Sequence, residues 1–367
     1  MRAHSLYIQI YVQCADAQCT QYHIAVQALR GLLGISTGAL IGPGQIERVR
    51  LGTTVATNAL LECRGAPLVL LTNSGLADLL RIGDQHRADL FALAQSERPF
   101  LASEVVEVPG RLDAHGAELE SPLWNDDLRN RLAALRARGL DHVVVALLHA
   151  HRNPAHELQC CDELKAVGFS RVVCSHQVSV KPRLVPRGQT ALVEAAVAPR
   201  LHGYLQQVQT ALGSSTPIRV MASSGALQSI KGLMAKDTIL SGPAAGMVGA
   251  IAAARSSGFE GVPVLGFDMG GTSTDVFCIP AGVGLEALER SPQTEIAGLT
   301  LLAPRLPIHT VAAGGGSILS TDEQRLQVGP RPAGADPGPA CYRRGGPLCL
   351  TDAHLLLGRL QVAHFPA

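Results

Sequence analysis

Two carboxylates flank a glycine- and hydroxyl-rich turn in the segment PVLGFDMGGTSTDV, residues 263–276. We expect a buried strand over 262–268 to deliver Asp268 to its end and a tight turn to follow, with Asp275 beyond it. Successive backbone N–H groups in such a turn form a concave anion site, and a carboxylate can hold Mg²⁺ or orient a water. The segment therefore predicts a phosphate-binding hairpin in which a carboxylate, Asp268 or Asp275, holds Mg²⁺ or orients a water. Its expected phosphate contacts are Gly270, Gly271, Thr272, Ser273 and Thr274.

Other phosphate-binding loops do not fit this chain. It has no G-K-[ST] sequence and only four lysines, and the hairpin segment is not G-x-G-x-x-G. The alternative is an ordinary tight β-turn with a polar tip, which remains open because a motif match is a hypothesis.

A second glycine run, AAGGGS at 312–317, also follows a strand-like stretch, residues 308–313. Three consecutive glycines suit a backbone that lies against an adenine or ribose, so Gly314, Gly315 and Gly316 are predicted to contact the nucleotide. The alternative is a flexible loop. The small residues of 240–258 predict a helix that packs closely against its neighbours.

The elements that must position these turns alternate between strand and helix. Apolar strands are expected at 67–72 and 142–148, which implies a mostly parallel, covered sheet. An amphipathic helix is expected at 125–138, an alanine-rich helix at 188–212 and a further helix at 226–233. In the segment 52–62, Thr53 or Thr54 is expected to cap a helix whose Ala56, Ala59 and Leu60 face the core.

Bulk composition excludes several classes of function. The chain has 367 residues, 47% of them hydrophobic, and a formal net charge of +1. This length favours two domains, and near-neutrality with only 4% aromatic residues argues against nucleic acid or an anionic membrane as a partner. Nine cysteines, an odd number without a C-x-x-C pair, indicate free thiols in a reducing cytoplasm.

Three histidines near residue 150 raise the question of a metal site. His149, His151 and His156 follow a strand, and only Glu157 joins them as a further ligand type. Capping and packing are therefore favoured over metal binding.

The ordered blocks of this chain resemble the hydantoinase A/5-oxoprolinase family from about residue 23 to the end. The hairpin itself is similar to the phosphate loop of the actin, sugar-kinase and heat-shock ATPase superfamily. The resemblance implies an α/β, two-domain fold of that kind with mixed sheets covered by helices, an N-terminal domain at 1–215 and a nucleotide-binding domain at 216–367. The blocks that carry it are GTTVATNALLE (52–62), RIGDQHRADLF (81–91), VPRGQTALVEA (185–195), LSGPAAG (240–246), GFDMGGTSTDV (266–276), TVAAGGGS (310–317) and GADPGPACYRRGGPLCLTDA (334–353).

The family also implies a reaction. ATP phosphorylates the oxygen of a lactam, most naturally 5-oxoproline, and water then opens the ring to an amino acid, here glutamate. This chain would supply the ATP- and Mg²⁺-binding half of an oligomeric, cytoplasmic enzyme, and its partner would be a hydantoinase-B-like subunit or a C-terminal half. By the same resemblance, Asp268 would hold Mg²⁺, and Asp268 and Asp275 would be the catalytic residues. Candidates near the substrate are Thr53, Thr54, Asn58, Arg81, Gln85, Arg87 and Asp89, for which a polar helix start and a solvated loop are the alternatives.

The chain departs from the family at its start. Members begin with another phosphate hairpin, and residues 1–22 contain no glycine with which to form one. We therefore expect a chain cut short at both ends and lacking the first hairpin. The alternatives are an inactive remnant, an A-type subunit of an N-methylhydantoinase or acetone carboxylase-like complex, a small-molecule kinase, or an assembly module.

Overall fold

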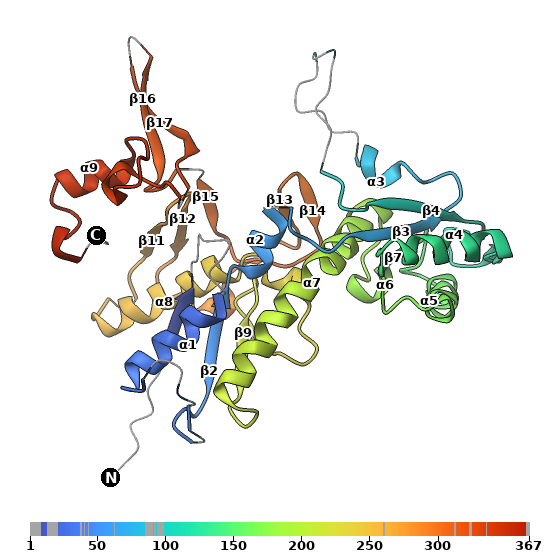
Figure 1. Cartoon of the computed structure of the whole chain (residues 1–367), viewed down its shortest axis with the longest axis horizontal. Helices are drawn as coiled ribbons and strands as arrows, with labels where there is room; N and C mark the ends of the chain where they lie inside the picture. Colours follow the sequence, from blue (N-terminus) through green and yellow to red (C-terminus); the bar gives the residue numbers. More distant parts are fainter. Residues whose placement is uncertain are drawn as a thin grey trace.

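The computed structural model places two α/β parts on either side of one long helix (Figure 1). It describes residues 9–12, 21–36, 39, 41–42, 44–61, 63–84, 91, 93, 99–259, 261–311, 313–322, 325–334 and 336–364. Among these, no helix is both long and apolar enough to cross a bilayer.

The first part is built on a four-stranded parallel sheet of order β4-β3-β7-β8. Alternate residues of its central strands enter two different cores, one shared with α7 and the other with α4 and α5. Both faces are therefore covered, which confirms the predicted parallel, covered sheet and explains its nearly continuous apolar strands. The elements are β3 (Leu68–Asn73), β4 (Glu104–Val108), β7 (His142–Ala146), β8 (Arg171–Cys174), α4 (Asp126–Ala137) and α5 (Ala155–Val167).

Helix α7 (Leu184–Leu212) runs between the two parts. It is buried along most of its length and packs against β7, α1, α2 and the hairpin β13 (Thr294–Ile296) to β14 (Leu299–Leu301). Gln189 Oε1 accepts a hydrogen bond from Thr300 N at 3.1 Å, which fixes that hairpin on the helix.

A mixed sheet of order β1-β2-β9-β10 begins the second part. Its first three strands are parallel, and β10 returns antiparallel to β9 after a turn in which Gly225 has a φ of 84°. The helix predicted over 226–233 is therefore wrong, because this short segment gains more from pairing with β9 than from local helix propensity. The sheet takes strands from both sides of residue 215, and the domain boundary proposed there stays a prediction. The elements are β1 (Gln9–Val12), β2 (Val49–Thr53), β9 (Ile218–Met221), β10 (Leu227–Ser229), α1 (Gln21–Leu32) and α2 (Val55–Leu61).

The second sheet of this part consists of β11 (Val264–Met269), β12 (Thr274–Ile279) and β15 (His309–Val311), all antiparallel. Helix α8 (Ser241–Ser256) covers one face, where Phe277 joins a core with Met247. The other face is open among the described residues: Leu265 is 72% exposed and Phe267 65%. The buried strand predicted before Asp268 is thus wrong, since β11 is an edge strand and only Gly266 in it is buried.

Shorter elements complete the described chain. They are α3 (Leu79–Ile82), β5 (Arg111–Leu112), β6 (Glu118–Glu120), α6 (Ser175–Val178), η1 (Ala235–Thr238), η2 (Leu285–Ala287), β16 (Ser317–Asp322), β17 (Arg325–Pro332), η3 (Ala340–Tyr342), α9 (Leu350–Leu356) and η4 (Val362–His364).

Candidate functional site

The β11–β12 hairpin presents a row of open backbone donors. Gly270 N donates to Ser273 O at 2.9 Å and closes the turn. The N–H groups of Gly271, Thr272 and Ser273 donate to no other described residue. The two glycines would have allowed a turn with left-handed φ values, but neither Gly270 nor Gly271 has one. Three consecutive unpartnered donors at an exposed tip are what an anion site requires.

Two carboxylates face each other at the base of this turn. Asp268 pairs with Asp275 across the two strands. Burial raises the pKa of Asp275, and the neighbouring Asp268 charge raises it further, against a 2.6 Å hydrogen bond from Thr310 Oγ1 that lowers it. Like charges placed opposite each other destabilise a strand pair unless something compensates them. The pair therefore fits a divalent cation with oxygen ligands such as Mg²⁺.

The glycine run at 314–316 packs on the back of the same turn. Gly315 N donates to Gly270 O at 2.8 Å and Gly316 N to Gly271 O at 2.7 Å. The Oγ1 of Thr351, at the start of α9, donates to Gly315 O at 2.7 Å. The close approach that the glycines make is thus to the hairpin backbone, and their contact with adenosine stays a prediction.

A methyl group at Gly314 is expected to disrupt the hairpin. An alanine Cβ there would lie 2.7 Å from Gly270 O and 2.8 Å from Ser273 N, and backbone atoms cannot move aside cheaply. We expect Gly314→Ala to lower the free energy of unfolding by about 1–3 kcal/mol and to weaken nucleotide binding, as measured by urea unfolding and calorimetry. The matched control is Gly203→Ala within α7, where no atom lies within 4 Å of the added Cβ. Equal stability of the two variants would contradict the packing described here.

Helix α8 connects two of the predicted substrate residues to the hairpin. Thr53 N donates a 3.2 Å hydrogen bond to Ser241 Oγ, and an alanine Cβ at Gly242 would lie 3.3 Å from Thr54 Cγ2. A Cβ at Gly246 would lie 3.6 Å from Asp268 Oδ2. Positions four apart share a helix face and are separated by about 6 Å along its axis. Thr54 and Asp268 are therefore neighbours along one face of α8.

The predicted cap of α2 is present, and the remaining substrate candidates lie elsewhere. Thr53 Oγ1 accepts a hydrogen bond from Val55 N at 3.2 Å, and Asn58 lies one turn into α2. Arg81 lies on α3, its guanidinium 4.8 Å from the ring centre of Phe100, on the far side of α7 from the hairpin (Figure 1). Gln85, Arg87 and Asp89 fall outside the described residues.

The three histidines considered for a metal site are divided between two environments. His156 Nε2 lies 2.7 Å from Glu118 Oε2. His149 and His151 line a separate pocket together with arginines, with their ring centres 6.3 Å apart.

Two residues of the site were not predicted. Thr310 holds Asp275, and Thr351 holds the glycine run from a segment 36 residues away. Each is an isolated threonine in its own sequence context, so only the tertiary fold reveals its role.

Comparisons with known proteins match nearly the whole chain. A family profile described as the hydantoinase/oxoprolinase N-terminal region covers residues 18–168. A second, described as hydantoinase/oxoprolinase, covers residues 187–367.

Individual relatives are longer than this chain. It is 36% identical to the 5-oxoprolinase of Dictyostelium discoideum, over 88% of this chain and 28% of that protein. It is 33% identical to the caprolactamase subunit alpha of Pseudomonas jessenii, over 84% of this chain and 45% of the relative. The solved structure of the ATP-dependent caprolactamase from that organism superimposes with a TM-score of 0.72 at 28% identity, covering 98% of this chain and 53% of the other.

Proposed function

The chain belongs to the hydantoinase A/5-oxoprolinase family, and we propose that it supplies the ATP-binding, phosphorylating half of an enzyme that hydrolyses a cyclic amide. The observation that carries this proposal is the hairpin with three open N–H donors, two opposed carboxylates and Thr54, which contacts α8 one helical turn away from the Asp268 contact. We propose 5-oxoproline as the substrate and glutamate as the product, because relatives named 5-oxoprolinase match most of this chain.

ATP, when bound, supplies the phosphoryl group that turns the unreactive amide oxygen into a leaving group. The residues of this chain would bind and orient the reactants and neutralise the charge on the phosphate groups. The N–H groups of residues 271–273 would hold phosphate oxygens, and Asp268 would hold Mg²⁺. Asp275, whose pKa is raised mainly by burial, would orient a water or accept its proton.

We assign the remaining machinery to a partner. The chain spans about a quarter to a half of the relatives it matches, and one of them is named as a subunit. A hydantoinase-B-like polypeptide is the proposed partner in a cytoplasmic complex. The open apolar face of β11, with Leu265 and Phe267 exposed, is explained if that polypeptide covers it.

The test is phosphate release from ATP with Mg²⁺ by the chain assembled with that partner. We expect 5-oxoproline to stimulate release and glutamate to form in equal amount. Stimulation by a hydantoin, caprolactam or acetone instead would replace the proposed substrate. Calorimetry with ATP on the chain alone separates binding from turnover: loss of binding in Asp268→Ala supports the hairpin as the site, and undiminished binding contradicts it.

A further inference from the structure

A second site lies in the first part of the fold, at the carboxyl ends of the parallel strands. The pocket has a volume of about 290 Å³ and is formed by the loop after β7, the start of α7 and the β5–β6 turn. The strand order places β4 on one side of β3, and β7 and β8 on the other. In open parallel sheets, ligands bind outside the carboxyl ends of the strands where the order reverses, here between β3 and β7. The volume is close to the lower end of about 300–1,000 Å³ for ligand pockets, which favours a small molecule over a nucleotide.

The pocket is basic. Its nine lining residues include no acid, and five carry basic side chains; these five define what we call the basic pocket. They are His149, His151, Arg152, Arg183 and Arg187.

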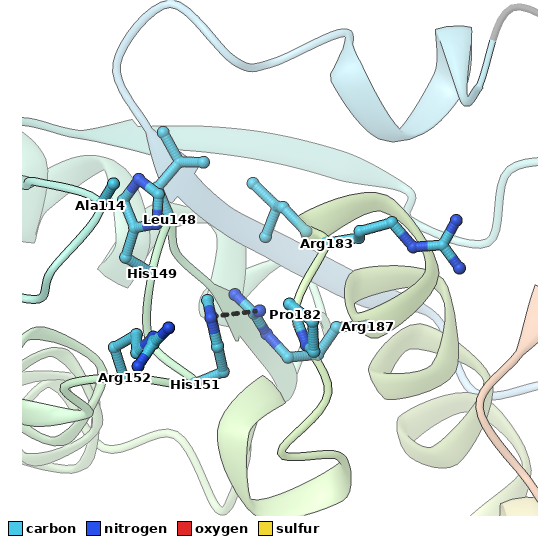
Figure 2. Close-up of a pocket in the computed structure, with 9 residues that line it drawn as sticks. Ala114, Leu148, His149, His151, Arg152, Pro182, Arg183 and Arg187 are labelled. Atoms are coloured by element: carbon cyan, nitrogen blue, oxygen red, sulfur yellow. Dashed lines mark hydrogen bonds between the residues drawn. The ribbon is translucent and has the colours of Figure 1, made fainter.

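Arg187 forms its floor and makes no direct ion pair with a described residue, although burial, which lowers the pKa of Arg187, is partly offset by the charge of Glu157. The residue is 1% exposed, and Figure 2 shows its guanidinium beside the His151 ring. It donates to neutral acceptors, Ser175 Oγ at 2.9 Å and Leu147 O at 2.5 Å, and no described carboxylate lies within ion-pair distance. Glu157 reaches it only through the Ser175 hydroxyl, which donates to Oε1 at 2.5 Å. Buried charges are normally paired, and this guanidinium has no carboxylate in direct contact, so an anion in the pocket would stabilise it.

The rim adds positive charge that no described residue neutralises. The side chain of Arg152 is exposed and makes no hydrogen bond or ion pair to another described residue. Burial lowers the pKa of His151, and the charges of Arg187 and Arg152 lower it further, as expected in a field of one sign.

The backbone at the pocket is held in uncommon conformations. His149 has a φ of 58° and Arg183 a φ of 71°, two of the five non-glycine positive values among the described residues. Side chains rarely adopt this region, and residues held there gather at ligand sites. Figure 2 shows the Arg183 side chain extending away from the other lining residues, so its contribution here is the turn into α7.

We propose that the basic pocket binds a small organic carboxylate, at a site separate from the hairpin. A guanidinium presents paired N–H donors that match a planar carboxylate, and Arg152 offers such a group at the rim. Arg187 adds positive charge beneath it, while its own N–H groups donate mostly to protein acceptors. The inference does not depend on the proposed ATP-dependent reaction. The carboxylate has two possible sources: the substrate or product of that reaction, or an unrelated small acid that acts as an effector.

The test titrates the full chain, without ATP, with sodium propionate, neutral propionamide and inorganic phosphate, followed by saturation-transfer NMR and competition. We expect binding of propionate but not propionamide, and affinity at least about tenfold weaker in Arg152→Gln, the effect of losing one charge-assisted hydrogen bond. Arg171→Gln is the matched control, because Arg171 is an exposed arginine at the opposite, amino end of strand β8 in the same sheet.

Competition by 5-oxoproline or glutamate at lower concentration than propionate would identify the reaction as the source of the carboxylate. Equal competition by all acids would identify an effector site; both results support the proposal. Propionate binding no better than propionamide, phosphate binding more tightly than any carboxylate, or equal loss in the Arg152→Gln and Arg171→Gln variants would overturn it.

Discussion

Asp275→Asn is expected to reduce 5-oxoproline-dependent ATP turnover by about 10²–10⁴-fold in the assembled enzyme, because it removes the buried carboxylate that would orient water or accept a proton. The same change should leave the chain at least as stable as before. The folded-state pKa of Asp275 lies above the ordinary 3.8, so ionisation opposes folding once the pH exceeds that value. Asparagine does not ionise and still offers Oδ1 to Thr310.

The sign of this effect can be checked by thermal unfolding between pH 3 and pH 8. The contribution of Asp275 to stability falls as the pH rises from about 3.8 through its raised folded pKa, and it is absent from the variant. The difference in stability should therefore favour the variant more at pH 8 than at pH 3. The control is Glu289→Gln, an exposed carboxyl in the same part of the fold. Full turnover by Asp275→Asn would exclude this residue from the chemistry, and a large loss of stability would contradict the assigned cause of its pKa.

Local sequence patterns were sufficient to predict several elements of the second part of the fold. The helical spacing of the apolar residues in 52–62 correctly predicted that Ala56, Ala59 and Leu60 are the buried residues of α2. The small residues of 240–258 correctly predicted a closely packed helix, since an added Cβ at Gly52 would lie 3.0 Å from Ala245 Cβ on α8. These features depend on neighbours in sequence and are therefore encoded locally.

Features that depend on contacts between distant segments could not be predicted from the sequence. Residues 264–267 carry no polar side chain, which predicts burial, but whether a strand is central or at an edge depends on which segments pair with it. The basic pocket has the same origin: Arg152 and Arg187 are 35 positions apart, and only the packing of α7 on β7 brings them together. Taken by itself in the sequence, His151 is a candidate metal ligand. In the structure its arginine neighbours make the environment suited to anions.

Glu157→Ala is expected to produce the largest loss of stability of any single change proposed, about 3–5 kcal/mol in the free energy of unfolding. The Glu157 side chain is fully buried and accepts four hydrogen bonds. Oε1 accepts from Leu147 N at 2.9 Å and Ser175 Oγ at 2.5 Å, and Oε2 accepts from His176 N at 3.0 Å and lies 2.6 Å from its Nδ1. Alanine would leave these buried donors without an acceptor and would loosen α5 from the ends of β7 and β8.

Urea unfolding of three variants separates this network from a general effect on α5. Glu157→Gln should lose less than Glu157→Ala, because the amide keeps one acceptor oxygen but faces two of the donors with its NH₂ group. Glu163→Ala on the same helix should cost at most about 1 kcal/mol, since its 3.0 Å ion pair with Arg129 is partly exposed to solvent. A Glu157→Ala loss no larger than that of Glu163→Ala would mean that Glu157 does not hold β7, α5 and α6 together. Because Ser175 joins Glu157 to Arg187, the network also supports the floor of the basic pocket, and propionate binding should weaken in Glu157→Gln under conditions where the chain remains folded.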